Sequence, residues 1–199
     1  MRIALVFSAV LTLLVSLVPT VSDAAELVGF HNRSVRPGTI VIKNSEKRLY
    51  LVLGGGRAIR YKVAVGKRGK VWTGQTFIDG KYVKPAWSPS AEVHRDHPNL
   101  PDVIAGGAPN NPMGVAALTL NGGKYAIHGT NRPGSIGRAV SYGCIRMANS
   151  DITDLFQRVG LRTQPTRTTN RLRSLPAACA AASCPWGARP RRRSPPPRR

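Results

Sequence analysis

Six short segments between residues 39 and 128 are rich in β-branched and aromatic residues, and turn-forming residues separate them. The segments are 39–43, 48–53, 58–65, 76–83, 116–120 and 124–127. Such runs favour β-strands, because branched side chains pack well on a pleated surface. Gly54-Gly55-Gly56 and Asn121-Gly122-Gly123 each stand between two of these segments, as a hairpin loop would. Asp79-Gly80 predicts a further tight turn in the middle of 76–83.

One α-helix is predicted after these strands. Ile152, Leu155, Phe156 and Val159 recur at helical spacing. Asn149 or Ser150 can cap the first turn of this helix with a side-chain oxygen. Several strands and one late helix predict a mainly β fold, a β-sandwich or barrel-like domain.

Residues 88–114 hold five prolines, three glycines and three asparagines, and a connection of this length is typical of a lid or a binding loop. His94, Asp96 and His97 in this segment raise the possibility of a metal site. A metal site needs three or four convergent ligands, and nothing in the spacing brings His128 to these three residues. Ordinary loop polarity is the preferred interpretation, so we predict no metal and no organic cofactor.

The chain is strongly basic, with 30 Lys and Arg against 9 Asp and Glu among 199 residues and a formal net charge of +21. Residues 25–164 account for +12 of this charge and residues 165–199 for +9. A basic protein body suggests a polyanionic partner such as nucleic acid, anionic lipid or an acidic cell-wall polymer. Composition alone does not choose among these three partners.

Residues 1–24 have the pattern of a secretory signal. Arg2 precedes an apolar run, and Ser22-Asp23-Ala24 supplies small residues at the expected cleavage site. An uncleaved anchor helix is the alternative, but the run is shorter than the roughly 20 residues that a membrane span needs. Export predicts a periplasmic or cell-envelope protein with no membrane span after cleavage. It also argues against nucleic acid as a partner.

Residues 164–199 are predicted to be a disordered tail, because arginine and proline dominate and no apolar periodicity is visible. The tail is either an electrostatic tether to an anionic cell-wall polymer or a segment without a selected role. Cys179 and Cys184 lie in this tail. If they pair in an oxidising compartment, Cys144 remains the one unpaired thiol.

The residues that suggest chemistry form two short motifs, Tyr125-Ala-Ile-His128-Gly129-Thr130 and Ser141-Tyr142-Gly143-Cys144-Ile-Arg146. An unpaired cysteine in an exported protein needs a nearby base or cation for thiolate chemistry, and His128 and Arg146 are the candidates. Backbone amides near a glycine can also hold an oxyanion. The alternative is a buried structural cysteine and a histidine that never meet.

These motifs, with fifteen residues between His128 and Cys144, resemble the active-site signature of L,D-transpeptidases of the YkuD type. The similarity extends through 107–114 and 131–137 and covers about residues 39–160, so a catalytic domain over 39–163 is expected. The resemblance implies a β-rich enzyme that cross-links peptidoglycan through donor and acceptor stem peptides, with no cofactor. It also implies a role in cell wall biogenesis.

The resemblance assigns a role to each residue of the motifs. Cys144 would be the nucleophile, and His128 would take its proton, with the Gly129 carbonyl on the other ring nitrogen. An acylation rate controlled by histidine should change near neutral pH. The backbone amides of Tyr142, Gly143 and Cys144 would hold the oxyanion. Ser141, Arg146 and Gly129 complete the implied oxyanion and substrate-binding residues. Arg146 would bind a substrate carboxylate, or else pair with Asp151 at the surface.

Two features depart from the family pattern. Tyr142 stands where a second histidine can precede Gly-Cys, so His128 is the only imidazole in the motifs. After the helix, residues 159–170 show no final apolar strand. This abrupt change indicates either a shifted reading frame or a genuinely divergent tail, and the first explanation predicts that a chain cut at Thr163 keeps its stability.

Three functions remain open at this stage. One is cross-linking by transpeptidation, and the second is L,D-carboxypeptidase or hydrolase activity through the same acyl-enzyme, with water in place of the amine. The third is a non-catalytic cell-wall-binding protein, against which the presence of both His128 and Cys144 argues.

Overall fold

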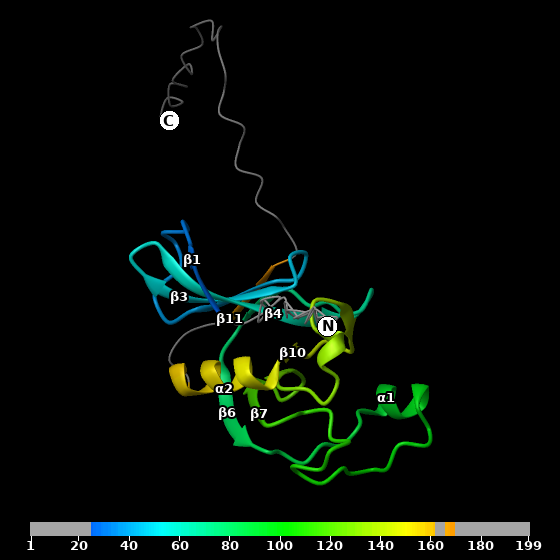
Figure 1. Cartoon of the computed structure of the whole chain (residues 1–199). Coiled ribbons are helices and arrows are strands. Elements are labelled where there is room, and N and C mark those ends of the chain that lie inside the picture. Colours follow the sequence, from blue (N-terminus) through cyan, green and yellow to red (C-terminus); the bar gives the residue numbers. More distant parts are fainter. Residues whose placement is uncertain (1–24, 162–165, 170–199) are drawn as a thin grey trace, which may run out of the picture.

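The computed structural model describes residues 25–161 and 166–169 (Figure 1). The strands are β1 (Glu26–Gly29), β2 (Ile40–Lys43), β3 (Arg48–Gly54), β4 (Arg57–Gly66), β5 (Gly74–Thr76), β6 (Ile78–Val83), β7 (Ala116–Leu120), β8 (Ala126–His128), β9 (Ala139–Ser141), β10 (Ile145–Met147) and β11 (Thr166–Thr169). The helices are α1 (Ala91–Asp96) and α2 (Asn149–Arg158), with a short 3₁₀ turn at Pro133–Ser135. The prediction of a mainly β fold with a late helix is confirmed.

The ten-residue strand β4 lies at the centre of the sheet. Along the main path the strand order is β5-β11-β2-β3-β4-β10-β8-β7-β6, and β1 and β9 also pair with β4. The first half of β4 pairs with β1 and β3, whereas Val63 and Ala64 pair with β10. A strand shared in this way joins two sheet halves, and the curled sheet encloses the core on one side.

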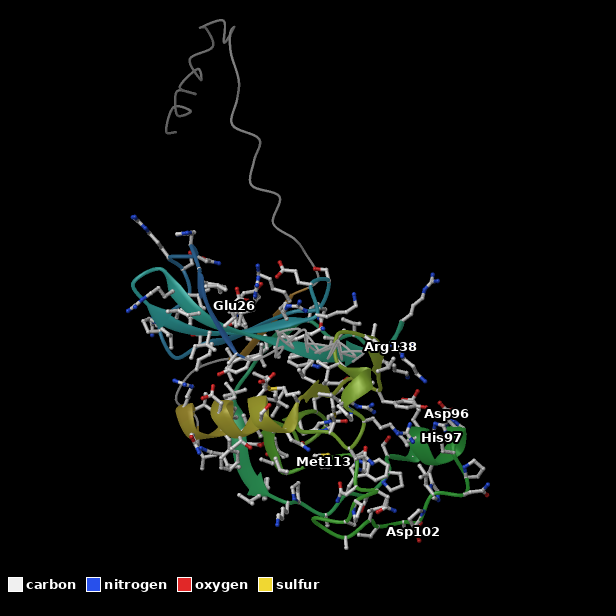
Figure 2. All side chains as sticks on the ribbon, viewed as in Figure 1. Glu26, Asp96, His97, Asp102, Met113 and Arg138 are labelled. Atoms are coloured by element: carbon white, nitrogen blue, oxygen red, sulfur yellow. The ribbon has the colours of Figure 1, made fainter. Side chains whose placement is uncertain are left out.

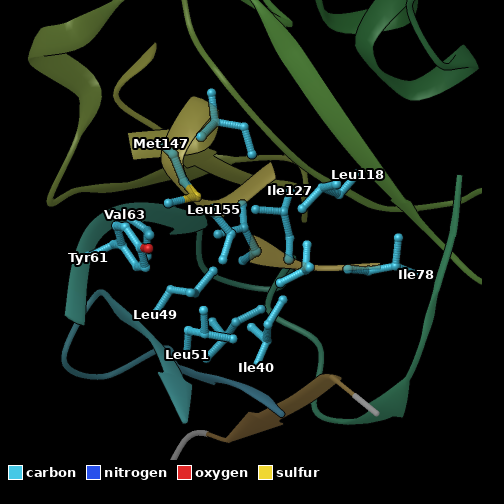
Figure 3. Packing of buried hydrophobic residues seen from close by; sticks show 14 of the residues in the cluster. Ile40, Leu49, Leu51, Tyr61, Val63, Ile78, Leu118, Ile127, Met147 and Leu155 are labelled. Atoms are coloured by element: carbon cyan, nitrogen blue, oxygen red, sulfur yellow. The ribbon is translucent and has the colours of Figure 1, made fainter. Parts of the chain in front are cut away.

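Alternation along the strands explains which side chains enter that core. Leu49 and Leu51 of β3 join Tyr61 and Val63 of β4 in the main buried cluster, and the intervening Tyr50 packs on the opposite face. This is the period of two that a pleated strand imposes. Figure 3 shows the main cluster filling the space between the curled sheet and α2.

Helix α2 closes the core with its apolar face. Ile152 and Leu155 are fully buried, as the helical spacing predicts. The hydroxyl of Tyr61 donates a hydrogen bond of 2.6 Å to Asp154, which ties β4 to the helix. The predicted capping of this helix is wrong, because Ala148 occupies the N-cap position and makes no side-chain cap. The Asn149 side chain accepts a hydrogen bond from the Thr130 amide instead.

Two further predictions about local structure are corrected by the fold. Asp79-Gly80 forms no hairpin turn: β6 continues through these residues and pairs with β7, with a register shift between Ile78 and Gly80. A bulge accommodates the glycine, and the Asp79 carboxylate accepts a hydrogen bond from Thr119 on β7. The long segment 88–114 also contains α1, which the sequence analysis did not predict.

A strand follows the late helix, and it lies inside the segment that was predicted to be a disordered tail. Strand β11 pairs in parallel with β2 and antiparallel with β5, so it fills the gap between them. Its sequence lacks apolar alternation, but its threonines are β-branched. Its backbone N–H and C=O groups pair with strands on both sides. The sheet therefore uses four residues of the segment assigned to the tail.

Several predictions fall on residues outside the described part of the chain. These are the secretory signal over 1–24, the rest of the tail after residue 169 and the pairing of Cys179 with Cys184. Within residues 25–161 and 166–169, no helix is both long and apolar enough to cross a membrane.

Removal of β11 should destabilise the domain. A chain that ends at Leu161 leaves the backbone groups of β2 and β5 without their partner strand, at a cost of about 1 kcal/mol for each hydrogen bond. We expect a drop of about 5–10 °C in the unfolding temperature, measured by calorimetry. A chain that ends at Asn170 retains β11 and is the matched control. Equal unfolding temperatures for the two chains would contradict this role of β11.

Candidate active site

The two motifs meet because β8 and β10 are adjacent parallel strands. Their register pairs Ile127 with Ile145 and His128 with Arg146. Cys144 immediately precedes β10, and the backbone of Ala126 on β8 is close enough to influence its thiol. The fold thus brings together the cysteine, the histidine and the arginine that the sequence analysis singled out.

His128 is held in one orientation by its neighbour. Its side chain is buried, and Nδ1 lies 2.7 Å from the carbonyl oxygen of Gly129, the contact that the family resemblance implied. A carbonyl can only accept, so Nδ1 carries the proton and Nε2 is left as the basic nitrogen. Burial, and then the positive charge of Arg146, lower the pKa of His128 to about 4. The imidazole is therefore neutral at neutral pH.

The thiol of Cys144 is also neutral in the resting site. Burial raises its pKa, and the Ala126 backbone and the Arg146 charge offset only part of this effect. Cys144 and His128 thus form a pair of uncharged groups instead of a thiolate and an imidazolium. A general-base role for His128 would then require the proton to move as the thiol attacks. The expected pH dependence near neutrality is corrected to a histidine pKa of about 4.

A tight loop sets the position of Cys144. Gly143 has φ = +121°, a conformation that favours glycine. The hydroxyl of Ser141 donates to the Cys144 carbonyl at 2.6 Å and accepts from the Gly143 amide at 3.1 Å. The Gly143 amide is thus engaged within the loop, which leaves the amides of Tyr142 and Cys144 for the predicted oxyanion role.

Trp72 and Tyr125 support this loop from one side, a role that the sequence analysis missed. The indole N–H of Trp72 donates to the Gly143 carbonyl at 3.1 Å. The rings of Trp72 and Tyr125 stack with their centres 5.4 Å apart and 9° between their planes. A side chain on Gly143 would overlap the Tyr125 ring. Trp72 precedes Gly143 by 71 residues, so no local sequence pattern connects them.

Asn149 holds the chain on the other side of His128. Its side-chain oxygen accepts hydrogen bonds from the amides of Thr130 at 3.0 Å and Val115 at 3.4 Å. A Cβ atom at Gly129 would overlap that oxygen, which explains why glycine follows the histidine. The start of α2 is therefore joined to the end of β8 and to the loop before β7.

A cleft with two parts opens beside these residues. The first part, of about 180 Å³, has a largely apolar lining that includes Trp87, Val93, Leu100 and Ile104, and we call it the apolar arm. The second part, of about 490 Å³, is lined by Gly134, Ser135, Arg138 and Val140, and we call it the cationic arm. Both arms share His97, Arg132, Tyr142 and Arg146.

Helix α1 buries none of its residues, and several polar contacts hold it beside the cleft. Tyr142 donates a hydrogen bond of 2.5 Å to Asp96 at the end of α1. Lys67 lies 3.5 Å from the same carboxylate and 3.8 Å from the centre of the Tyr142 ring. A Lys70–Glu92 ion pair is a further contact. Tyr142 thus binds the segment that borders the cleft.

The residues that suggested a metal have separate partners. His94 lies 3.6 Å from Asp102, Asp96 binds Tyr142 and Lys67, and His97 lines the cleft. Figure 2 shows Asp96 and His97 together near α1, on the same side of the molecule as Arg138. Across the described ranges, no three His, Cys, Asp or Glu side chains are grouped as a metal site requires.

Comparison with known proteins assigns the family. The model of the L,D-transpeptidase catalytic domain, YkuD, matches residues 37–168. The chain belongs to this family.

Named relatives and solved structures agree with this assignment. The chain is 40% identical over 134 residues to the probable L,D-transpeptidase YbiS of Escherichia coli, a match that covers 63% of this chain and 42% of the relative. It is 37% identical over 140 residues to the probable L,D-transpeptidase ErfK/SrfK of Salmonella typhimurium, covering 66% and 44%. The chain thus spans less than half the length of these relatives. An L,D-transpeptidase from Mycobacterium smegmatis shares the fold, with a TM-score of 0.52 at 16% identity over 66% of this chain and 58% of that one.

The pKa values of His128 and Cys144 should both depend on the positive charge of Arg146. We expect His128 to titrate at about 4, measured by NMR of its ring protons and assigned with His128→Gln. Arg146→Gln removes a positive charge, so the pKa values of His128 and of the Cys144 thiol should both rise. Alkylation of Cys144 by iodoacetamide at neutral pH should then become slower. Arg33→Gln removes an exposed charge outside the cleft and should change neither value.

The hydrogen bond from Trp72 should matter to the reactivity of Cys144. Trp72→Phe keeps an aromatic ring against Tyr125 but removes the N–H that holds the Gly143 carbonyl. We expect acylation of Cys144 by a carbapenem to slow about five- to tenfold, the scale of one hydrogen bond. Mass spectrometry of the trapped protein gives the rate. Tyr82→Phe, at an exposed aromatic residue on β6, is the control, and an unchanged rate in Trp72→Phe would refute the role.

Proposed function

We propose that this protein is an exported peptidoglycan L,D-transpeptidase that forms cross-links through an acyl-enzyme on Cys144. The family acts on peptidoglycan peptides. The roles proposed for Cys144 and His128 are supported by the geometry of the site. The observation that carries the proposal is the parallel pairing of β8 and β10, which sets His128 beside Arg146, two residues after Cys144. The His128–Gly129 contact supports the same assignment, because it leaves Nε2 as the basic nitrogen.

In the first half of the reaction, a donor stem peptide acylates the enzyme. His128 takes the proton of the Cys144 thiol as the sulfur attacks the amide carbonyl between the third residue and the terminal D-Ala. The carbon–sulfur bond forms and the carbon–nitrogen bond breaks. The imidazolium then returns the proton to the leaving amine, so D-Ala departs and a thioester remains on Cys144. The low pKa of His128 makes it a strong acid once protonated, which favours this second proton transfer.

In the second half, an amine of another stem peptide attacks the thioester. A new carbon–nitrogen bond forms, the carbon–sulfur bond breaks, and the proton lost by the amine returns to the thiolate through His128. The amides of Tyr142 and Cys144 are the proposed donors to the oxyanion in both halves. Arg146 is half-buried and lines both arms of the cleft, so its guanidinium can bind a substrate carboxylate.

Hydrolysis of the same thioester is the second candidate function. The cationic arm is the larger of the two parts of the cleft, at about 490 Å³, and it leaves room for water as well as for an amine. Whether water or an amine arrives decides between an L,D-carboxypeptidase and a transpeptidase. Export through residues 1–24 and action in the periplasm or cell envelope belong to the same proposal, as does attachment of the tail to an anionic cell-wall polymer.

Cys144 should be the only thiol that activity requires. With disaccharide-tetrapeptide as substrate, Cys144→Ala should abolish formation of the cross-linked product and covalent trapping by a carbapenem, both followed by mass spectrometry. Cys179→Ala and Cys184→Ala are matched controls that should retain both activities. A Cys144→Ala protein that still forms product would refute the proposal. Release of D-Ala without a cross-linked product in the unaltered protein would favour the hydrolase.

A further inference from the structure

A separate pocket lies on the Trp72 side of the loop that carries Cys144, whereas the cleft lies on the Tyr142 side. Its volume is about 300 Å³, and it shares no lining residue with the apolar arm or the cationic arm. The stacked rings of Trp72 and Tyr125 form part of its wall. All of strand β5 also lines it, and we call it the β5 pocket. Its volume lies at the lower end of the range for small-molecule sites.

The part of this lining that the structure describes is aromatic and polar. Phe77 adds a third ring to those of Trp72 and Tyr125. The polar side chains are two carboxamides and two hydroxyls, which belong to Gln75, Asn121, Thr73 and Thr76. Within the described part of the chain, none of these four side chains makes a hydrogen bond. Their donors and acceptors are therefore available to a ligand.

The described lining of the β5 pocket carries no charged side chain, in contrast to the rest of the protein. The chain has a formal net charge of +21, and Arg132 and Arg146 line both arms of the cleft. The nitrogen of Lys124 lies 5.4 Å from the centre of the Tyr125 ring, but Lys124 does not line the pocket. A site for an anion would use the cations that this protein has in excess. The β5 pocket therefore fits a neutral ligand.

Aromatic rings, carboxamides and hydroxyls together match the chemistry of an N-acetylated sugar. One face of a pyranose ring presents C–H groups, which pack against an aromatic ring. A carboxamide both donates and accepts hydrogen bonds, so Gln75 and Asn121 can bind an acetamido group or a hydroxyl. The acetamido methyl group needs apolar contact, and Leu120 and Phe77 line the same pocket.

We propose that the β5 pocket binds an N-acetylhexosamine ring of the glycan that carries the stem peptides. The inference rests on the proposed function, because peptidoglycan joins its stem peptides to a chain of N-acetylated amino sugars. The pocket adjoins the loop of Cys144, since Trp72 donates to the Gly143 carbonyl and a side chain on Gly143 would overlap Tyr125. A glycan held there keeps its attached stem near Cys144, which raises the local concentration of the substrate.

The first test measures the binding of neutral oligosaccharides to the full-length protein. Chitotetraose carries an acetamido group on each ring, and cellotetraose has the same linkage with hydroxyls in their place. We expect chitotetraose to shift the NMR signal of the Trp72 indole N–H, assigned with Trp72→Phe. It should bind about fivefold more tightly than cellotetraose, the scale of one hydrogen bond. Added salt should not change the affinity, because neither ligand is charged. Equal affinities, or no shift of the Trp72 signal, would overturn the inference.

Variants of the two carboxamides assign this binding to the pocket. Gln75→Leu and Asn121→Ala should each weaken chitotetraose binding about fivefold, because each removes a hydrogen-bonding group. Gln157→Leu on α2 and Asn99→Ala make the same changes at exposed residues outside the pocket, and both controls should bind normally. Undiminished binding in both pocket variants would overturn the inference.

The second test measures whether the pocket assists the proposed reaction. Mass spectrometry follows acylation of Cys144 by disaccharide-tetrapeptide and by free tetrapeptide, each below saturation. The unaltered protein should react about fivefold faster with the disaccharide form, and Gln75→Leu should bring this ratio close to one. Gln157→Leu is the matched control and should retain the ratio. Equal rates for the two substrates in the unaltered protein would overturn the inference. Failure of both substrates to acylate Cys144 would instead overturn the proposed function.

Discussion

The parallel pairing of β8 with β10 is the constraint on which the active site depends. Parallel neighbours need a crossover connection, because the chain must return to the starting end of the sheet. Here the crossover is residues 129–144, with Cys144 at its end and Arg132 and Arg138 along its length. One continuous segment therefore supplies Arg132, Arg138, Tyr142 and Cys144, and the register of two short strands determines where they stand relative to His128.

The same arrangement determines the charge state of the site. Burial disfavours both the imidazolium of His128 and the thiolate of Cys144, so the resting pair is neutral. Arg146 acts on the two groups in opposite ways with respect to reactivity, because its charge favours the thiolate and opposes the imidazolium. In the reaction that we propose, the two groups become charged only as the thiol attacks a carbonyl, when amides of the loop can stabilise the developing oxyanion.

Local patterns in the sequence predicted much of the fold and the central residues of the site. β2, β3, β4, β7 and β8 agree with predicted segments to within about two residues, because β-branched and aromatic side chains favour a pleated strand. The motifs pointed to Cys144 and His128, which the fold places on or beside two adjacent strands, and their catalytic roles stay a prediction. Strand β11 was missed because its backbone pairing, and not an apolar pattern, places it between β2 and β5. Trp72 was missed because its contact with Gly143 depends on tertiary structure alone. The turn predicted at Asp79-Gly80 is wrong because a β-bulge can use the same residues as a tight turn.

The surroundings of Cys144 are stabilised unequally on their two sides. On one side, stacked rings and a hydrogen bond from Trp72 fix the backbone of Gly143, in contact with the buried core. On the other side, Tyr142 donates a hydrogen bond to Asp96 of α1, a helix that buries none of its residues. The Lys67–Asp96 ion pair at the same place lies at the surface, where such pairs contribute about 0–1 kcal/mol each. The loop around Cys144 is therefore anchored in the core through Trp72, whereas the α1 side of the cleft depends on contacts at the surface.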